Sequence, residues 1–339
     1  MPFRLQWAEL VCPQCHGELT EGSSLADPAL ACTNCERSYP VVCGIPDLRV
    51  FPDPYISFEG DRTKAKMLHS RFADLDFAGI VALYYHITPE TPPHDVLSNT
   101  RRLLNAVGRA EATLAAWDSS FGPVRGGTLL DVGCGTAPLL VASRTRFERA
   151  IGIDVGMRWL VVAKRRLLEL GVDVPLVAAC GEALPFRDGT FDAVTMDSFL
   201  EIAKEADAAA REARRVLRSG GRLYVQTPNR FSVGPDPHIG VPAGGLLPQG
   251  VVNTIAKQKM ARPPLRHFFT FGSLARLLRR SGFTRVRTEI PAVSDGQRAQ
   301  FGAFGNRAAS WYNALRARPI TRQLLMAVGP MLHGTAERE

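Results

Sequence analysis

The chain has 339 residues, of which 45% are hydrophobic, so it suits two domains or one core with a sizeable appendage and is not globally disordered. No apolar run reaches the roughly 18 residues that span a bilayer, and the first residues lack the apolar stretch of a secretory signal. We therefore expect a cytoplasmic protein without a membrane span.

The net charge of +8 is unevenly distributed along the chain. Residues 257–339 hold 15 lysines and arginines and four acids, a net +11, which leaves −3 for residues 1–256. A basic quarter suits an anionic partner such as RNA, a phosphorylated substrate or a membrane surface. Solvated helix faces are the simpler interpretation, because charge patterning indicates association and not a particular site.

Four of the seven cysteines form two C-x-x-C pairs within residues 8–50. The pairs are Cys12-Pro-Gln-Cys15 and Cys32-Thr-Asn-Cys35, with sixteen residues between them. Each pair points two thiolates at one ion, and two pairs complete a tetrahedron around a structural Zn²⁺. A unit this small also needs such a staple to fold. The alternatives are chance pairs or a redox pair, and a redox pair would require a βαβ context that is not visible here.

Residues 51–125 are predicted to form a connector and a helical cap. Helical character runs over 61–79, and an amphipathic helix is predicted over 95–120. Three prolines interrupt Tyr84–His94, which we therefore expect to be irregular.

From residue 126 onward, strand-like and helix-like segments alternate, which predicts a doubly wound α/β fold with a mostly parallel sheet. Helices are expected over 137–147, 157–170, 204–217 and 271–281. After residue 291 we expect two more helical segments, 311–315 and 320–328, and a short strand over 330–336. The predicted strands are Thr128–Val132, Ala150–Asp154, Val174–Ala178, Phe191–Met196, Arg222–Thr227 and Thr284–Ile290. The expected domains are 1–50, 51–125 and 126–339, the last with a C-terminal helical insertion.

A glycine-rich turn follows the first of these strands, in Leu129–Pro138. Gly133 allows a tight turn, and Gly135 lets the backbone approach a ligand closely. A dinucleotide fingerprint would require a third glycine where Pro138 stands, which argues against NAD. Asp131, two residues before the first glycine, indicates a ligand with a positive amino group.

Asp154 ends the next predicted strand, 21 residues after Gly133. At this distance an acid meets the ribose hydroxyls of a bound nucleoside, whichever nucleoside it is. The alternative role is to cap the helix that begins near Met157.

Four further segments follow in order: Gly181–Phe186, Gly189–Val194, Phe199–Glu201 and Arg214–Leu223. Together with the loop at 131–137 they resemble the class I S-adenosylmethionine-dependent methyltransferase family, in the branch that also contains quinone methyltransferases. The resemblance covers about residues 125–290. It implies a Rossmann-like, seven-stranded sheet and S-adenosylmethionine as cofactor.

The resemblance also implies a set of cofactor contacts. Asp131, Gly133, Cys134 and Gly135 would surround the methionine part, and Asp154, next to Val155, would bind the ribose hydroxyls. Cys180, Gly181 and Glu182 would lie at the adenine edge, and Met196, Asp197 and Ser198 would line the pocket after the fourth strand. Cys180 departs from the family, which often has an aspartate there to accept the adenine amino group. A thiol is a poor acceptor, so backbone carbonyls or Glu182 would replace it.

The sequence after the second cysteine pair, Tyr39–Leu48, resembles the Trm112-like zinc-ribbon family, whose small members are partners of methyltransferases. In that family an aspartate usually stands where this chain has Cys43. A zinc ribbon also precedes the bacterial rRNA guanine methyltransferases, but the Trm112-like pattern fits Tyr39–Leu48 better.

Methyl transfer requires alignment of the acceptor with the sulfonium and exclusion of water, and a base only if the acceptor must lose a proton. Acceptor loops are expected at Tyr84–His94, Thr227–Leu247 and Leu265–Thr270. His238 is the first candidate base, followed by His86 and His267, although a lone loop histidine is more often structural. The Asn-Pro-Pro-Tyr motif of nucleobase amino methyltransferases is absent after the fourth strand, which disfavours exocyclic-amine methylation.

Three functions are compatible with these features. The first is methylation of a small organic or natural-product acceptor at oxygen, nitrogen or carbon. The second is methylation of tRNA or rRNA, with the zinc ribbon and the basic C-terminal region binding phosphates, which predicts steeply salt-dependent binding. The third is a non-catalytic cofactor-binding scaffold, motivated by Cys180. The sequence leaves the acceptor atom and the oligomeric state open.

Overall fold

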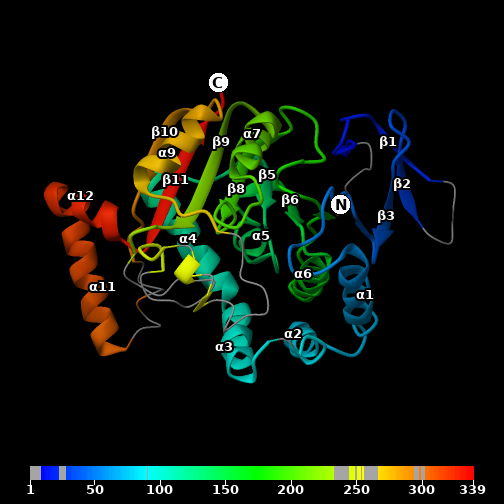
Figure 1. Cartoon of the computed structure of the whole chain (residues 1–339), viewed down its shortest axis with the longest axis horizontal. Coiled ribbons are helices and arrows are strands. Elements are labelled where there is room, and N and C mark those ends of the chain that lie inside the picture. The colour runs from blue at the N-terminus through cyan, green and yellow to red at the C-terminus, as the bar shows by residue number, and fades with distance from the viewer. Residues whose placement is uncertain are drawn as a thin grey trace.

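The computed structural model describes residues 9–22, 28–89, 91–232, 244–248, 250–252, 254–255, 266–293, 298 and 302–339. A small β unit comes first, a run of helices follows, and a large sheet with helices on both faces occupies the rest of the chain (Figure 1).

The first unit is a four-stranded antiparallel sheet in the order β1-β2-β3-β4. Its strands are β1 (Leu19–Glu21), β2 (Ala29–Cys32), β3 (Ser38–Val42) and β4 (Ile45–Pro46). Cys43 and Gly44 form the two-residue turn between β3 and β4, and both have positive φ, 53° and 74°. Tight hairpin turns favour asparagine, aspartate or glycine at such positions, so the thiol of Cys43 stands where an aspartate fits more easily.

Four helices connect this unit to the large sheet: α1 (Phe58–His69), α2 (Phe77–His86), α3 (Pro93–Leu104) and α4 (Ala106–Phe121). The helical character predicted over 61–79 belongs to α1 and α2, and the single helix predicted over 95–120 is divided between α3 and α4. The expectation that Tyr84–His94 is irregular was wrong at both ends, because Tyr84–His86 continue α2 and residues 93 and 94 begin α3. A proline restricts its own backbone conformation and that of the residue before it, so it does not prevent the residues further upstream from being helical. Pro93 lies in the first turn of α3, where a proline is tolerated.

The large sheet has seven strands in the order β10-β11-β9-β8-β5-β6-β7. All are parallel except β11, which is antiparallel to both of its neighbours. The predicted doubly wound, mostly parallel sheet is thus confirmed. The strands are β5 (Gly126–Val132), β6 (Phe147–Asp154), β7 (Leu176–Ala178), β8 (Phe191–Asp197), β9 (Leu217–Pro228), β10 (Thr284–Glu289) and β11 (Met331–Glu337).

Helices cover both faces of this sheet (Figure 1). One face packs into a core with α1, α2, α4, α5 (Pro138–Ala142) and α6 (Met157–Glu169). The other face packs with α7 (Ala206–Val216), α9 (Phe271–Arg280) and the N-terminal β unit. β5 pairs with β6 on one side and with β8 on the other, so the order of the strands reverses at β5. In sheets of this kind, ligands bind beyond the carboxyl ends of the strands at this switch point.

The N-terminal β unit is joined to the large sheet by backbone hydrogen bonds. Leu48 N donates to Ala178 O at the end of β7 (2.8 Å), and Val11 N donates to Pro185 O (3.0 Å). The unit therefore extends the β7 edge of the large sheet and leaves less of that edge open for another chain.

The tail predicted after residue 291 is confirmed as two helices and a strand. α11 (Ala303–Arg316) and α12 (Pro319–Val328) form a hairpin beside β10, and β11 then inserts between β9 and β10 (Figure 1). Within the described parts of the chain, no helix has the length and apolarity required to cross a bilayer.

Candidate functional site

The glycine loop joins β5 to α5 at the switch point of the sheet. Gly133, Gly135 and Ala137 all have positive φ, at 76°, 52° and 60°. A side chain on Gly133 would also collide with Phe199, because its Cβ would lie 2.9 Å from Cδ2 of that ring. Glycine is required at 133 by both conformation and space. At Gly135 a Cβ would meet no described atom within 4 Å, so the open backbone there leaves room for a ligand.

Asp154, the last residue of β6, holds this loop in place. Its carboxylate accepts hydrogen bonds from Gly135 N (2.9 Å) and Gly156 N (2.7 Å). The amides of the first turn of α6 have another partner, because Met157 N and Arg158 N donate to Asp61 of α1, at 2.7 and 3.2 Å. The alternative role of Asp154 as the cap of that helix was therefore wrong, and Asp154 faces the glycine loop.

Three acidic side chains surround the loop: Asp131, Asp154 and Asp197. Burial raises the pKa of Asp131 to about 7, with further contributions from Asp197 and Asp154, although Thr195 Oγ1 donates to it at 2.8 Å. Burial also raises the pKa of Asp154 to about 6 and that of Asp197 to about 6. Like charges gathered in such surroundings favour a cationic ligand, which would relieve their repulsion.

The predicted adenine edge lies after β7. Cys180 Sγ donates to the carbonyl of Phe51 (3.5 Å), and a Cβ on Gly181 would lie 2.4 Å from Cζ of Phe199. Glu182 accepts from Lys204 N (2.7 Å), so one of its oxygens is used at the approach to α7. The linker from the N-terminal unit, at Phe51, thus forms part of this edge.

The side chains of the remaining predicted cofactor residues differ in how far they are exposed. Asp197 and Ser198 are half-buried at the end of β8, and Val155 is half-buried after β6. The side chains of Cys134 and Met196 lie in the hydrophobic core on the two faces of the sheet. These two residues can therefore reach a ligand only through backbone atoms.

A row of polar side chains crosses the sheet from Asp197. Gln226 of β9 donates from Nε2 to Asp197 Oδ1 (2.7 Å), and its Oε1 lies 2.5 Å from Nε2 of His333 in β11. Because the Gln226 amide donates to Asp197, its oxygen accepts, which assigns the imidazole proton to Nε2. Burial lowers the pKa of His333 to about 3, so the ring is neutral at physiological pH. The His333 Nδ1 and Trp117 Nε1 atoms are buried with no hydrogen-bond partner among the described residues, and the centroids of the two rings are 5.9 Å apart.

Sequence reasoning missed Gln226 and His333 as site residues. Neither belongs to a motif, and their approach depends on β11 returning between β9 and β10. The strand candidate at 330–336 was a partial signal, but its register with β9 could not be read from the sequence.

The four cysteines of the two C-x-x-C pairs are brought together, with their sulfur atoms all within 4.8 Å of one another. The Sγ–Sγ distances are 3.6 Å for Cys12 and Cys35 and 3.5 Å for Cys15 and Cys32. A tetrahedral Zn²⁺ with bonds of about 2.3 Å requires sulfur separations of about 3.8 Å. The donor set and its geometry therefore fit zinc.

A buried network of charges connects the N-terminal unit to α6. Arg49 donates to Asp47 (2.7 Å), to Asp61 (2.6 Å) and to the carbonyl of Val155 (2.7 Å), next to Asp154. Arg158 of α6 donates to Asp61 as well (2.9 Å). The side chains of Arg49 and Asp61 are fully buried, so the backbone at the predicted ribose site is fixed by residues from outside the large sheet.

The three histidines proposed as bases lie in different surroundings. His86 is exposed in the last turn of α2. His267 is bound within the fold, with Nε2 2.9 Å from Ala203 O and its backbone N donating to Glu201 O (2.7 Å). His238 lies outside the described residues. Among the described residues, the titratable groups next to the glycine loop are the carboxyls of Asp131, Asp154 and Asp197, and not these histidines.

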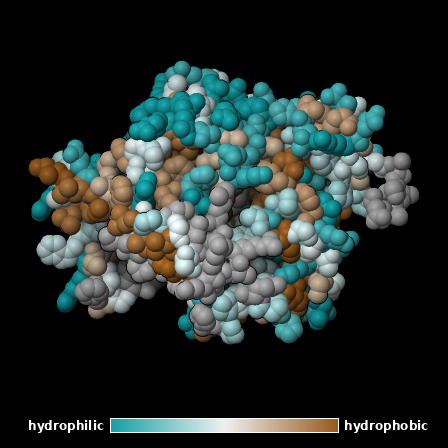
Figure 2. Space-filling view, in the orientation of Figure 1, coloured by the Kyte–Doolittle hydropathy of each residue, from teal (hydrophilic) through white to brown (hydrophobic). Residues whose placement is uncertain are grey.

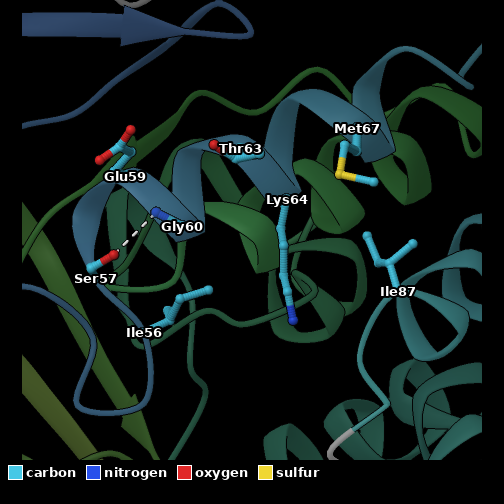
Figure 3. A pocket seen from close by; sticks show the side chains of 8 residues that line it. All are labelled: Ile56, Ser57, Glu59, Gly60, Thr63, Lys64, Met67 and Ile87. Atoms are coloured by element: carbon cyan, nitrogen blue, oxygen red, sulfur yellow. Dashed lines mark hydrogen bonds between the residues drawn. The ribbon is translucent and has the colours of Figure 1, made fainter.

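A hollow of about 480 Å³ lies on the outer side of α1 (Figure 3). It is lined by side chains from Ile56 to Met67 and by Ile87, and Lys64 points into it and donates to Thr88 Oγ1 (3.1 Å). None of these residues belongs to the glycine loop or to the acidic cluster, so this hollow is separate from the candidate site.

Residues 130–225 match a family model described as a methyltransferase domain. The Escherichia coli ubiquinone/menaquinone biosynthesis C-methyltransferase UbiE is 37% identical over 110 residues, which are 30% of this chain and 42% of the relative. The chain thus matches less than half the length of this curated relative.

Two solved structures resemble the chain at low sequence identity. A methyltransferase from Thermotoga maritima aligns with a TM-score of 0.47 and 18% identity over 71% of this chain and 96% of its own. A chain of the Haloferax volcanii complex between the Trm112 methyltransferase activator and a methyltransferase aligns with a TM-score of 0.48 and 16% identity, over 71% and 94%. The matched residues run from β5 into β9 of the seven-stranded sheet and include the glycine loop, so this part of the chain is similar to a methyltransferase domain.

Proposed function

We propose that the chain transfers a methyl group from S-adenosylmethionine to a small organic acceptor. The observation that carries this proposal is the cluster of Asp131, Asp154 and Asp197 around the glycine loop, with pKa values of about 7, 6 and 6. The cofactor carries a sulfonium and an ammonium group, which are the charges such a cluster favours. When bound, it supplies an electrophilic methyl group.

In this proposal the chain's own residues orient the cofactor. Gly133 and Gly135 admit the methionine part, Asp131 faces its ammonium group, and Asp154 with Val155 binds the ribose. The half-buried Ser198 and the backbone at Cys134 and Met196 complete the wall. Phe199, whose ring lies against Gly133 and Gly181, closes the floor between the two ends of the site.

The adenine edge is assigned to Gly181 and to the carbonyl of Phe51, in place of the family's carboxylate. The thiol of Cys180 already donates to that carbonyl, which has a second lone pair for another donor. Glu182 contributes less, because Lys204 N uses one of its oxygens.

We propose that Asp197, and not one of the histidines, is the base that takes the proton from the methyl acceptor. Its pKa of about 6 is close to the value that general-base catalysis favours near neutral pH. Gln226 and Ser198 both donate to Oδ1, at 2.7 and 3.2 Å, which orients the carboxylate and leaves Oδ2 to take the acceptor's proton. Gln226, held by the buried His333, is a positioning residue for Asp197.

The four cysteines are proposed to hold a structural Zn²⁺, which would stabilise the N-terminal unit. This unit is proposed to act as a Trm112-like partner within the same chain, because its backbone already bonds to the β7 edge and to Pro185.

The test is calorimetry with S-adenosylmethionine followed by a turnover screen against metabolite and RNA pools. We expect cofactor binding and transfer to a small molecule that changes little with salt. Absence of binding at millimolar cofactor would overturn the proposal. Turnover on RNA alone, with affinity falling steeply as salt rises, would instead support the RNA methyltransferase. Asp197→Asn should lower kcat while cofactor affinity at neutral pH changes less, and Gln226→Ala should shift the pH–rate profile without abolishing turnover.

A further inference from the structure

The helical hairpin before the last strand presents an unpartnered apolar face. On α12, Ile320, Leu324 and Val328 are one helical turn apart and are 79%, 66% and 46% exposed. No described residue of this helix is buried. Trp311 on α11 is 71% exposed. Apolar surface gathers at the end of the molecule where these two helices lie (Figures 1 and 2). A helix normally buries such a stripe against another surface.

The hairpin is also strongly basic. No aspartate or glutamate occurs in residues 296–336, which contain five arginines: Arg298, Arg307, Arg316, Arg318 and Arg322. Interfacial helices that lie on anionic membranes combine arginines with exposed aliphatic and tryptophan side chains in this way. Exposed tryptophan is also typical of the boundary between water and lipid.

A polar hollow of about 330 Å³ lies at the base of the hairpin, between the end of α4, β10 and the start of α12. Arg287, Arg316 and Arg322 line it, and Glu289 is its one lining acid, so its charge is positive. Arg322 pairs with Glu289, and Arg287 donates to Ser120 O (2.8 Å). Ser120 Oγ and Arg322 Nε are buried there without a hydrogen-bond partner among the described residues. These donors suit the oxygens of a phosphate group.

We propose that the α11–α12 hairpin docks on an anionic phospholipid surface, with the α12 stripe in the acyl region and a headgroup phosphate in the basic hollow. A second copy of the chain is a poorer occupant, because it would bring two basic, acid-free hairpins together. RNA would use the arginines and leave the aliphatic stripe in water. This surface function does not depend on methyl transfer, and its test does not measure methylation.

The experiment is sedimentation of the full chain with phosphatidylcholine vesicles, with and without phosphatidylglycerol. We expect binding to the anionic vesicles, weakening with added salt, and a blue shift of tryptophan emission that Trp311→Phe removes. The double variant Ile320→Gln/Leu324→Gln should bind at least about 30-fold more weakly, because two side chains lose their burial in lipid. Both positions are exposed, so the fold should not change.

Matched variants separate the hairpin from the rest of the surface. Leu97→Gln/Leu168→Gln replaces two leucines that are each 58% exposed on other helices, and it should bind like the parent chain. Removal of two charges, Arg287→Gln in the basic hollow and Arg318→Gln at the start of α12, should weaken binding about 30-fold. Arg211→Gln/Arg276→Gln, on α7 and α9, should change it little.

Three results would overturn the proposal. The first is equal binding to neutral and anionic vesicles. The second is binding that neither hairpin double variant weakens. The third is failure to bind vesicles while light scattering shows a dimer that Ile320→Gln/Leu324→Gln dissociates, which would assign the face to a second copy of the chain.

Discussion

The acidic cluster makes cofactor affinity dependent on pH, and Asp131 is the residue with which to test it. Its pKa of about 7 means that the carboxyl is largely protonated at pH 5.5 in the free protein. A cationic ligand requires the ionised form, so affinity should rise as pH rises through this pKa and level off above it. For one group with a pKa of about 7, affinity at pH 7.5 should exceed that at pH 5.5 by about 25-fold.

Asp131 should make the stability of the fold fall as pH rises, whereas it makes cofactor affinity rise. An aspartate with a pKa of about 7 in the folded chain and 3.8 in the unfolded chain binds more protons folded than unfolded. Folding stability contributed by Asp131 therefore falls as pH rises from about 4 to 7, by about 4 kcal/mol at most. Asp131→Asn removes this penalty, so the free protein should become more stable at pH 8 while its affinity for S-adenosylmethionine decreases.

Calorimetry with S-adenosylmethionine and S-adenosylhomocysteine between pH 5.5 and 7.5, at constant ionic strength, measures the affinity, and urea unfolding measures the stability. Asp173→Asn, at an exposed position after α6, is the control and should change neither quantity. An affinity that is flat or that falls as pH rises would refute the reasoning. So would an Asp131→Asn variant that loses stability at pH 8 without losing affinity, because Asp131 would then be structural.

Three further predictions concern metal, space and charge. Purified protein should contain one zinc per chain by metal analysis, and Cys12→Ser should lose it and expose the N-terminal unit to protease first; a zinc-free, fully folded chain would contradict the site. Gly181→Ala should cost roughly 1–3 kcal/mol in urea unfolding, since its Cβ meets a ring at 2.4 Å, whereas Gly108→Ala, with open space in α4, should be neutral or stabilising. Arg49→Met leaves buried carboxylates unpaired and should cost about 3–5 kcal/mol, whereas Arg71→Gln, in an ion pair exposed on both sides, should cost less than about 1 kcal/mol. If the two variants lost equal free energy of unfolding, burial of an ion pair would not determine how much the pair contributes to stability.

The central sheet could be predicted from the sequence because its signals are local. Each predicted strand overlaps an observed strand. The strands at the centre of the sheet are short apolar runs between turn residues, because parallel strands are buried on both faces. The edge strand β10 instead alternates between more and less exposed residues. The hydrogen bond between Asp154 and the glycine loop also lies within one βαβ unit, so their proximity could be expected from their spacing in the sequence. The spacing within and between the two C-x-x-C pairs is also visible in the sequence, so their gathering around one point could be predicted.

The parts that could not be predicted depend on contacts between distant segments. Asp61 caps α6 from 96 residues away, and no pattern near either residue marks the pair. Gln226 and His333 meet only because β11 inserts next to β9, 107 residues later in the chain. Asp197 was expected at the cofactor pocket by resemblance, but its role as the candidate base required the neighbours that β9 and β11 supply. The histidines were named because they lie in the expected acceptor loops, whereas the raised pKa of Asp197 arises from burial that no local pattern marks.

This chain has Cys180 at a position where the class I family often has an aspartate. The segment at Phe51, which follows the N-terminal unit, explains why a thiol fits there. A carboxylate at 180 would place an ionised oxygen near the carbonyl of Phe51, which now accepts from the thiol at 3.5 Å, and two acceptors without a proton between them repel. Because Phe51 follows the segment that bonds to the β7 edge, the thiol and the attached N-terminal unit are compatible with each other. We therefore expect Cys180→Asp to lose roughly 1–3 kcal/mol in urea unfolding and to gain no affinity for S-adenosylmethionine, whereas Cys180→Ser, which can still donate, should stay close to the parent chain. Tighter cofactor binding by a fully stable Cys180→Asp variant would show that the family's adenine contact can be restored here and that Phe51 does not replace it.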